Sequence, residues 1–149
     1  MPHSDPEALE AFRNGRRPPG LAGGGATTAE VEVTADLTAQ SIGSGDLPVL
    51  ASPAIVRLVE RAAVAMLRGR LPAELTTVGT AFDLRHHAPT PVGRWVRLRV
   101  GLDPGEDRAL TFRFRVDDGV DDVAKGSHVR VLVERNRFLA KANAPRSGR

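Results

Sequence analysis

A carboxylate, a hydroxyl and a histidine are the residues of this chain whose types and spacing could do chemistry. Glu60 lies in an apolar run that opens with Ser52-Pro53, and a second polar cluster containing His86 and His87 follows further along the chain. A carboxylate in so apolar a stretch is paired, solvated at the edge of the apolar face, or kept for chemistry. Such a set could supply a nucleophile or general base together with a proton carrier.

The role of Glu60 has two interpretations. Arg57 lies three residues earlier on the same expected helix, so an ordinary surface ion pair explains the carboxylate without any function. As a functional group, it would act as a general base on water or as a nucleophile. The sequence does not choose between these two chemical roles.

Ser52 is a residue type favoured at helix N-caps, with Pro53 as the first helical residue. At that place it could also help the positive helix end to polarise a carbonyl group. Eight residues at about 1.5 Å each put Ser52 and Glu60 ~12 Å apart along a regular helix, too far for contact. They could share a substrate only through a bent helix start or by pairing across a two-fold axis.

The two histidines are adjacent on an expected strand, so their rings should point to opposite faces of the sheet. This geometry argues against both binding one metal ion, and the sequence offers no evident third ligand. We therefore expect neither a metal nor a cofactor. A structural histidine without a catalytic role is the alternative for either ring.

The elements that must position these residues predict an α+β fold. One strand is expected over Val31–Leu37, and an apolar helix runs from Ser52 to a stop near Gly69. Four further strands are expected, over Thr77–His87, Arg94–Leu102, Ala109–Val116 and Ser127–Arg135. A five-stranded antiparallel sheet with one apolar face would wrap around the single long helix, which is the hotdog arrangement.

The alternation of residues separates the two faces of that sheet. Valine, leucine and phenylalanine side chains of the two middle strands point one way, toward the expected core: Val96, Leu98, Val100, Leu102, Leu110, Phe112, Phe114 and Val116. Arginines at positions 97, 99, 113 and 115 point the other way and are expected to be solvated, although they could also dock coenzyme A phosphates or an acidic carrier protein. By the same alternation Arg130 is interpreted as a solvent-facing arginine.

Length and composition indicate one domain. Its 149 residues are expected to form a flexible arm over 1–28, with a short helical turn near Pro6–Phe12, a folded domain over 29–140 and a tail over 141–149. The chain has no cysteine, and it shows no signal-peptide core or membrane span, so we expect a cytoplasmic protein without a membrane partner. A net charge of +3 with five Phe, one Trp and no Tyr does not indicate a nucleic-acid partner.

Three segments carry a resemblance to a known family. They are the run Val49–Glu60, the run from Val78-Gly79-Thr80-Ala81 into Arg85–Gly93, and Asp118–Asp121 followed by Gly126–Arg130. In this order they resemble the hotdog-fold thioesterases of the fluoroacetyl-CoA thioesterase type, over roughly Glu30 to Lys141. The resemblance implies a homodimer that hydrolyses a small or medium acyl thioester of coenzyme A or an acyl carrier protein, with its site at the dimer interface.

The resemblance also implies roles for individual residues. Ser52, Glu60 and His86 match the catalytic threonine, glutamate and histidine of the family. Gly79 and Arg130 match a glycine and an arginine that line the acyl pocket, and substrate contacts are expected from Leu47 and Leu50 in the loop before the helix. Serine replaces the family's threonine, and this loop lacks the phenylalanine gate associated with fluoroacetyl selectivity.

Two other functions remain open at this stage. A hydratase or dehydratase acting on an acyl thioester would use the same histidine and acid for proton transfer at carbon. A non-catalytic thioester-binding or scaffold module would need neither group for turnover.

Overall fold

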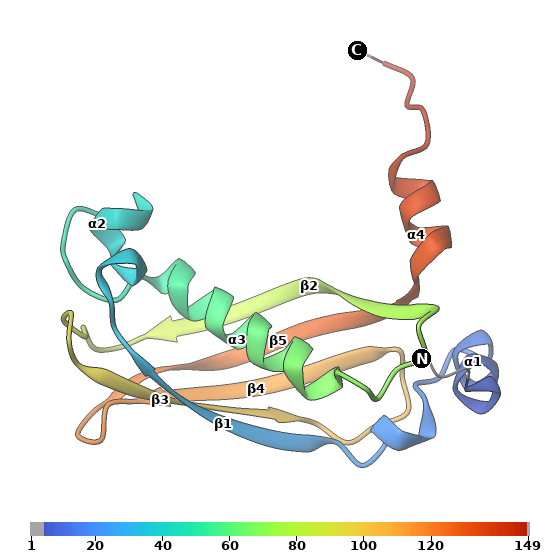
Figure 1. The fold of residues 1–149 in the computed structure, drawn as a ribbon, viewed down its shortest axis with the longest axis horizontal. Coiled ribbons are helices and arrows are strands. Elements are labelled where there is room, and N and C mark those ends of the chain that lie inside the picture. Colours follow the sequence, from blue (N-terminus) through green and yellow to red (C-terminus); the bar gives the residue numbers. More distant parts are fainter. Residues whose placement is uncertain (1–4, 149) are drawn as a thin grey trace.

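The computed structural model describes residues 5–148 and has one sheet and one long helix (Figure 1). The chain runs α1 (Pro6–Arg13), η1 (Pro19–Leu21), β1 (Gly25–Glu32), η2 (Ala35–Leu37), α2 (Ala39–Ile42), α3 (Ser52–Leu67), β2 (Leu75–His86), β3 (Trp95–Leu102), β4 (Ala109–Asp117), β5 (Asp122–Glu134) and α4 (Arg135–Ala142). The strands form one five-stranded sheet in the order β1-β3-β4-β5-β2, with antiparallel neighbours. The predicted α+β class and hotdog arrangement are confirmed.

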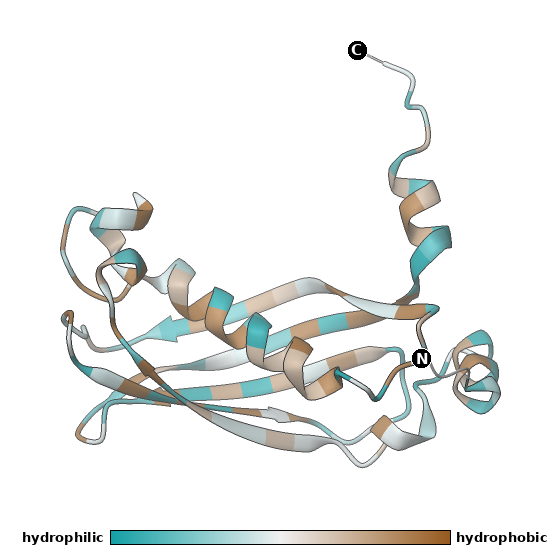
Figure 2. Cartoon of the chain, in the orientation of Figure 1, coloured by the Kyte–Doolittle hydropathy of each residue, from teal (hydrophilic) through white to brown (hydrophobic). Residues whose placement is uncertain are grey.

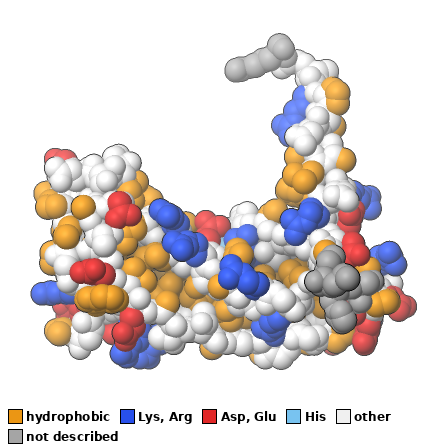
Figure 3. All heavy atoms as spheres, viewed as in Figure 1, with side chains coloured by type: hydrophobic (Ala, Val, Ile, Leu, Met, Phe, Trp, Pro, Cys, Tyr) orange, Lys and Arg blue, Asp and Glu red, His pale blue; other side chains and the backbone are white. Residues whose placement is uncertain are grey.

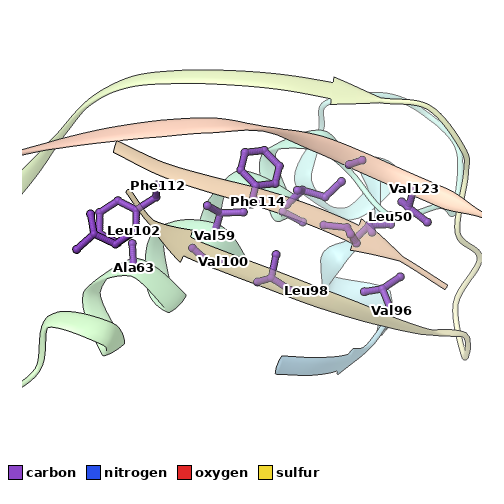
Figure 4. Packing of buried hydrophobic residues seen from close by; sticks show 14 of the residues in the cluster. Leu50, Val59, Ala63, Val96, Leu98, Val100, Leu102, Phe112, Phe114 and Val123 are labelled. Atoms are coloured by element: carbon purple, nitrogen blue, oxygen red, sulfur yellow. The ribbon is translucent and has the colours of Figure 1, made fainter. Parts of the chain in front are cut away.

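The core lies between α3 and one face of the sheet (Figure 4). All eight apolar side chains predicted for the inner face of β3 and β4 are buried there, and α3 contributes Ile55, Val59 and Ala63. Polar and apolar residues alternate along α3 in Figure 2, so one side of the helix faces the sheet and the other faces outward. Arginines 97, 99, 113 and 115 are exposed on the opposite face of the sheet, which we call the outer face.

The start of the sheet differs from the predicted strand over Val31–Leu37. β1 ends at Glu32, and residues Ala35–Leu37 form a 3-10 turn closed by the Leu37 amide donating to the Thr34 carbonyl. The physical reason is pairing, since β1 matches β3 from Gly25 opposite Leu102 to Glu32 opposite Trp95. Backbone pairing continues for one residue beyond β1, since the Val33 amide donates to the Arg94 carbonyl and the Gly93 amide donates to the Val33 carbonyl, and the chain then enters the 3-10 turn.

The described part of the expected arm, residues 5–28, is folded against the body rather than extended from it. Arg17 is almost fully buried, and its guanidinium donates hydrogen bonds to the carbonyls of Leu21, Asp103, Asp107 and Ala109. Four acceptors satisfy a buried cation that would otherwise be costly to desolvate. Residues 1–4 of this expected arm lie outside the described residues.

The C-terminal strand also runs differently from its prediction. β5 begins at Asp122, before the expected Ser127, and α4 follows it directly, with the Glu134 side chain accepting a hydrogen bond from the Arg137 amide. Figure 1 shows α4 projecting away from the sheet and α3. No helix among the described residues has the length and apolar character needed to cross a membrane.

Candidate functional site

A groove runs along the outward side of α3 and contains Glu60. Its volume is about 490 Å³, and it is lined by α3 residues and one arginine of β5: Pro53, Val56, Arg57, Glu60, Arg61, Val64, Arg68 and Arg130. Figure 3 shows Lys and Arg side chains gathered over this side of the molecule. The groove therefore offers one carboxylate among cations, a setting that favours an anionic ligand.

Arg130 holds the Glu60 carboxylate. Its Nη1 lies 3.1 Å from Glu60 Oε2, while its Nε donates to Thr77 Oγ1 at 2.9 Å and its Nη2 to the Thr77 carbonyl at 3.2 Å. Arg130 is 7% exposed, so the interpretation of this residue as a solvent-facing arginine is wrong. The side chain points inward because residues 128, 130 and 132 share the face of β5 that α3 covers.

The ion pair of Glu60 is thus made with β5 and not with Arg57. Arg57 lines the same groove but has no ion pair within residues 5–148. The Glu60 side chain keeps 41% of its surface exposed, so the carboxylate is held on one side and open on the other. A group held in this way can meet a ligand without losing its orientation.

His128 completes this cluster and was not predicted as a site residue. Its Nδ1 lies 2.9 Å from the Ala81 carbonyl, its Nε2 lies 3.2 Å from Arg130 Nη1, and its Nε2 lies 3.9 Å from Glu60 Oε2. A carbonyl only accepts and a guanidinium only donates, so the proton is on Nδ1 and the ring is neutral. The ring supports Arg130 without adding a charge beside Glu60.

Gly79 leaves space for these three side chains. It pairs with Arg130 across β2 and β5, next to a register shift between Gly79 and Ala81. A Cβ added at position 79 would lie 3.0 Å from Glu60 Oε2, 3.1 Å from His128 Cε1 and 3.4 Å from Arg130 Nη1. The structure therefore brings Gly79, Glu60 and Arg130 together, and any larger residue would enter the space before the carboxylate.

A second polar pair lies at the start of α3. Ser52 Oγ and His86 Nδ1 are 2.8 Å apart in a hydrogen bond, and His86 Nε2 is buried without a hydrogen-bond partner in the described chain. Burial lowers the pKa of His86, the Ala88 carbonyl opposes this, and the neighbouring His87 adds a smaller lowering. His87, the first residue after β2, is exposed, whereas His86 is half-buried.

Ser52 is not the N-cap of α3. The cap position is Ala51, which provides no side-chain hydrogen bond, and Ser52 is already helical. The amides of Ala54 and Ile55 both donate to the Ala51 carbonyl, and Pro53 has no amide hydrogen. The hydroxyl of Ser52 is therefore free to bond His86, and few backbone donors of this helix end are left for a ligand.

The two clusters are not joined within one chain. α3 is helical from Ser52 through Leu67, so the ~12 Å rise between Ser52 and Glu60 holds and a bent helix start is ruled out.

The two predicted substrate residues lie in different environments: Leu50 is buried in the core, whereas Leu47 is exposed in the loop before α3. Within residues 5–148, no group of three or more His, Cys, Asp or Glu side chains could hold a metal ion.

Comparison with known proteins identifies relatives of one kind. Residues 33–136 match the family model described as fluoroacetyl-CoA-specific thioesterase. The chain is 34% identical to a fluoroacetyl-CoA thioesterase of Streptantibioticus cattleyicolor over 93 residues, which are 62% of this chain and 67% of that protein. These relatives are named as thioesterases, which are hydrolases of acyl thioesters.

Solved structures agree with this match. A structure of the fluoroacetyl-CoA thioesterase FlK superposes with a TM-score of 0.73 at 29% identity, covering 82% of this chain and 96% of that one. A variant of the same enzyme in complex with fluoroacetate and CoA superposes with a TM-score of 0.69 at 29% identity, covering 77% of this chain and 97% of that one. A hot-dog-like protein from Thermanaerovibrio acidaminovorans shares the fold, with a TM-score of 0.76 at 21% identity, covering 85% of this chain and 96% of that one.

Proposed function

Since the chain belongs to the fluoroacetyl-CoA-specific thioesterase family, we propose that it hydrolyses a small or medium acyl thioester of coenzyme A or an acyl carrier protein, with Glu60 as the central catalytic group. The observation that carries the proposal is the held carboxylate: Arg130 Nη1 orients Glu60 from one side at 3.1 Å, and the other side opens into the groove. Gly79 keeps the space before it free for a thioester carbonyl.

Two routes are consistent with this geometry. As a general base, Glu60 takes a proton from water, the hydroxide adds to the thioester carbonyl, and the intermediate expels the thiolate, which is then protonated. As a nucleophile, Glu60 attacks the carbonyl carbon, the C–S bond breaks, and water hydrolyses the resulting anhydride. Arg130 supports both routes because its hydrogen bond keeps the carboxylate oriented.

We assign Ser52 and His86 to the same reaction, at the carbonyl oxygen or leaving group. The ~12 Å rise between Ser52 and Glu60 along α3 supports a site shared between two copies of the chain. β2 is an edge strand of the sheet, so pairing two sheets edge to edge would form the homodimer and cover that edge.

A panel of acyl-CoA and acyl-pantetheine thioesters, read with a thiol reagent, tests the activity. The FlK variant carrying a threonine-to-serine change was solved with acetyl-CoA, so acetyl-CoA is a natural first substrate here. Release of free thiol with Glu60-dependent turnover supports hydrolysis. Water addition or loss at the acyl chain without thiol release would support the hydratase alternative.

Subunit exchange tests the shared site. A Ser52→Ala protein is mixed with a Glu60→Gln protein. If each site takes the two groups from different chains, the heterodimer has one site that lacks both groups and one site that has both. Partial recovery of activity is expected if the two groups come from different chains. Proven exchange without recovery would place both groups of each site on one chain, and a monomer by light scattering would reject the dimer.

A further inference from the structure

The outer face of the sheet carries a row of cations that the thioesterase site does not use. Strand pairing places Arg99 opposite Arg115, Arg115 opposite Lys125, and Lys125 opposite Arg85. Four neighbouring strands thus contribute one cation each to a single line across the sheet, which we call the cation row. All four residues are exposed.

The neighbouring lines of the sheet are balanced where the cation row is not. On one side Arg97 is paired with Glu30 at 3.1 Å, and on the other Arg113 is paired with Asp103 at 2.9 Å. Among residues 5–148, Arg99, Arg115 and Lys125 have no ion pair, and Arg85 has one with Asp83 at 3.7 Å. Like charges directly opposite each other destabilise a sheet, so this row costs stability until an anionic group lies against it.

The cation row borders a hollow large enough to receive part of another macromolecule. The hollow has a volume of about 820 Å³ and is lined by all four cations together with small residues such as Ala26, Gly101 and Ser127. Small side chains beside long cationic ones form a shallow trough across the strands. The trough lies on the face opposite α3, away from Glu60.

We propose that the cation row is a docking surface for an acidic α-helix of a partner protein. Strands about 4.8 Å apart give the four cations a span of ~14 Å. Acidic side chains one helical turn apart repeat at about 5.4 Å, close enough for flexible arginine and lysine side chains to meet them one by one. An acidic helix therefore matches the row in charge, spacing and length.

A single-stranded nucleic acid fits the surface less well. Binding of unpaired bases relies on aromatic stacking platforms, and the aromatic residue lining the hollow, Phe114, is buried. The exposed Trp95 lies on the same face, but four residues along β3 from Arg99, or ~13 Å away at about 3.3 Å per residue. The row offers charge without stacking.

Fluorescence anisotropy with a labelled, alanine-rich peptide tests the proposal. The peptide has about 20 residues, enough to be helical, with glutamate at every fourth position, and its glutamine counterpart is the probe control. The variant Arg99→Gln/Arg115→Gln/Lys125→Gln should lose at least about tenfold in affinity, because each exposed contact contributes a few-fold. The matched control Arg94→Gln/Arg97→Gln/Arg137→Gln removes the same charge at exposed arginines that do not line the hollow, and its affinity should stay within about threefold of wild type.

Thermal unfolding without peptide gives a second readout. The triple variant of the cation row should melt at the same temperature as wild type or higher, because it removes repulsion between like charges. The control loses the ion pairs Arg94–Asp118 and Arg97–Glu30, so its melting temperature should not rise. Equal peptide binding by both variants, absent binding at low salt, or tighter binding of a single-stranded oligonucleotide than of the acidic peptide would overturn the proposal. Thioester hydrolysis is a separate assay and should be unchanged in both variants.

Discussion

The two polar clusters of α3 differ in how they are held. Glu60 belongs to a charged, cross-element cluster in which Arg130 from β5 is itself fixed by Thr77 and His128. Ser52 and His86 form a neutral pair with one hydrogen bond, and a ring nitrogen of His86 stays unpartnered in the described chain. A buried cation holds the carboxylate of the first cluster, whereas a single hydrogen bond holds the second cluster together. We therefore propose that Glu60 carries out the chemistry and that Ser52 and His86 support it.

Glu60→Gln is the change with the largest expected effect on this comparison. The amide has nearly the same shape but neither a base nor a nucleophile, so turnover should fall at least about a hundredfold. Thiol release under saturating substrate measures the loss, with circular dichroism to check the fold. Near-wild-type turnover in a folded variant would remove Glu60 from the mechanism and leave the Ser52–His86 pair as the reacting group.

His86→Ala should cost less, about tenfold or more, if the second cluster supports rather than drives the reaction. His87→Ala is the matched control, because His87 is adjacent in sequence but exposed, just beyond the end of β2. Steady-state kcat and KM for both variants decide the matter. Damage confined to the His87 variant would contradict the assignment of His86.

The sequence alone predicted the positions of some residues of these two clusters and not of others. Alternation on β3 and β4 predicted the apolar face, and helical spacing correctly placed Ser52 far from Glu60. The inward direction of Arg130 was missed because alternation relative to Val129 and Val131 cannot say which face is covered. The half-buried valines lie on the outer side, and Arg130 lies under α3.

His128 shows what signal was available. It stands two residues before Arg130, so the period of a strand places both side chains on one face of the sheet. Once one of them is known to point inward, the other is expected to point inward as well. The folded N-terminal segment carried no such signal, since the acceptors of Arg17 include carbonyls far along the chain, in the β3–β4 connection and at Ala109. Contacts of that range are set by tertiary packing rather than by local pattern.

Gly79→Ala should reduce kcat/KM by about tenfold, because the new methyl enters the space between Glu60, His128 and Arg130 and a misplaced carboxylate loses orientation. The nearest atom, Glu60 Oε2, ends a side chain that is partly exposed and can shift, whereas His128 and Arg130 are buried and held by hydrogen bonds, so the free energy of unfolding should fall by about 1 kcal/mol. Gly101→Ala is the control, since its Cβ would meet only the Gly25 carbonyl at 3.6 Å. Equal kinetics in the two variants would show that the space before Glu60 is not used.

The smallest expected effect is a displacement of the acid limb of the pH–rate profile. If neutral His86 is the active form, kcat/KM rises with pH through the pKa of this residue. Burial lowers that pKa, so the neutral ring persists to lower pH than an ordinary histidine, and the limb should lie below about pH 6.5. The same lowering means that the unfolded state binds more protons, so stability should fall as the pH drops through this range. Rates and chemical unfolding measured across pH 5 to 8, in wild type and His87→Ala, provide the check. Because His87 slightly lowers the pKa of His86, its removal should move the limb a little toward higher pH, and a limb above that of free histidine would contradict a buried, neutral His86.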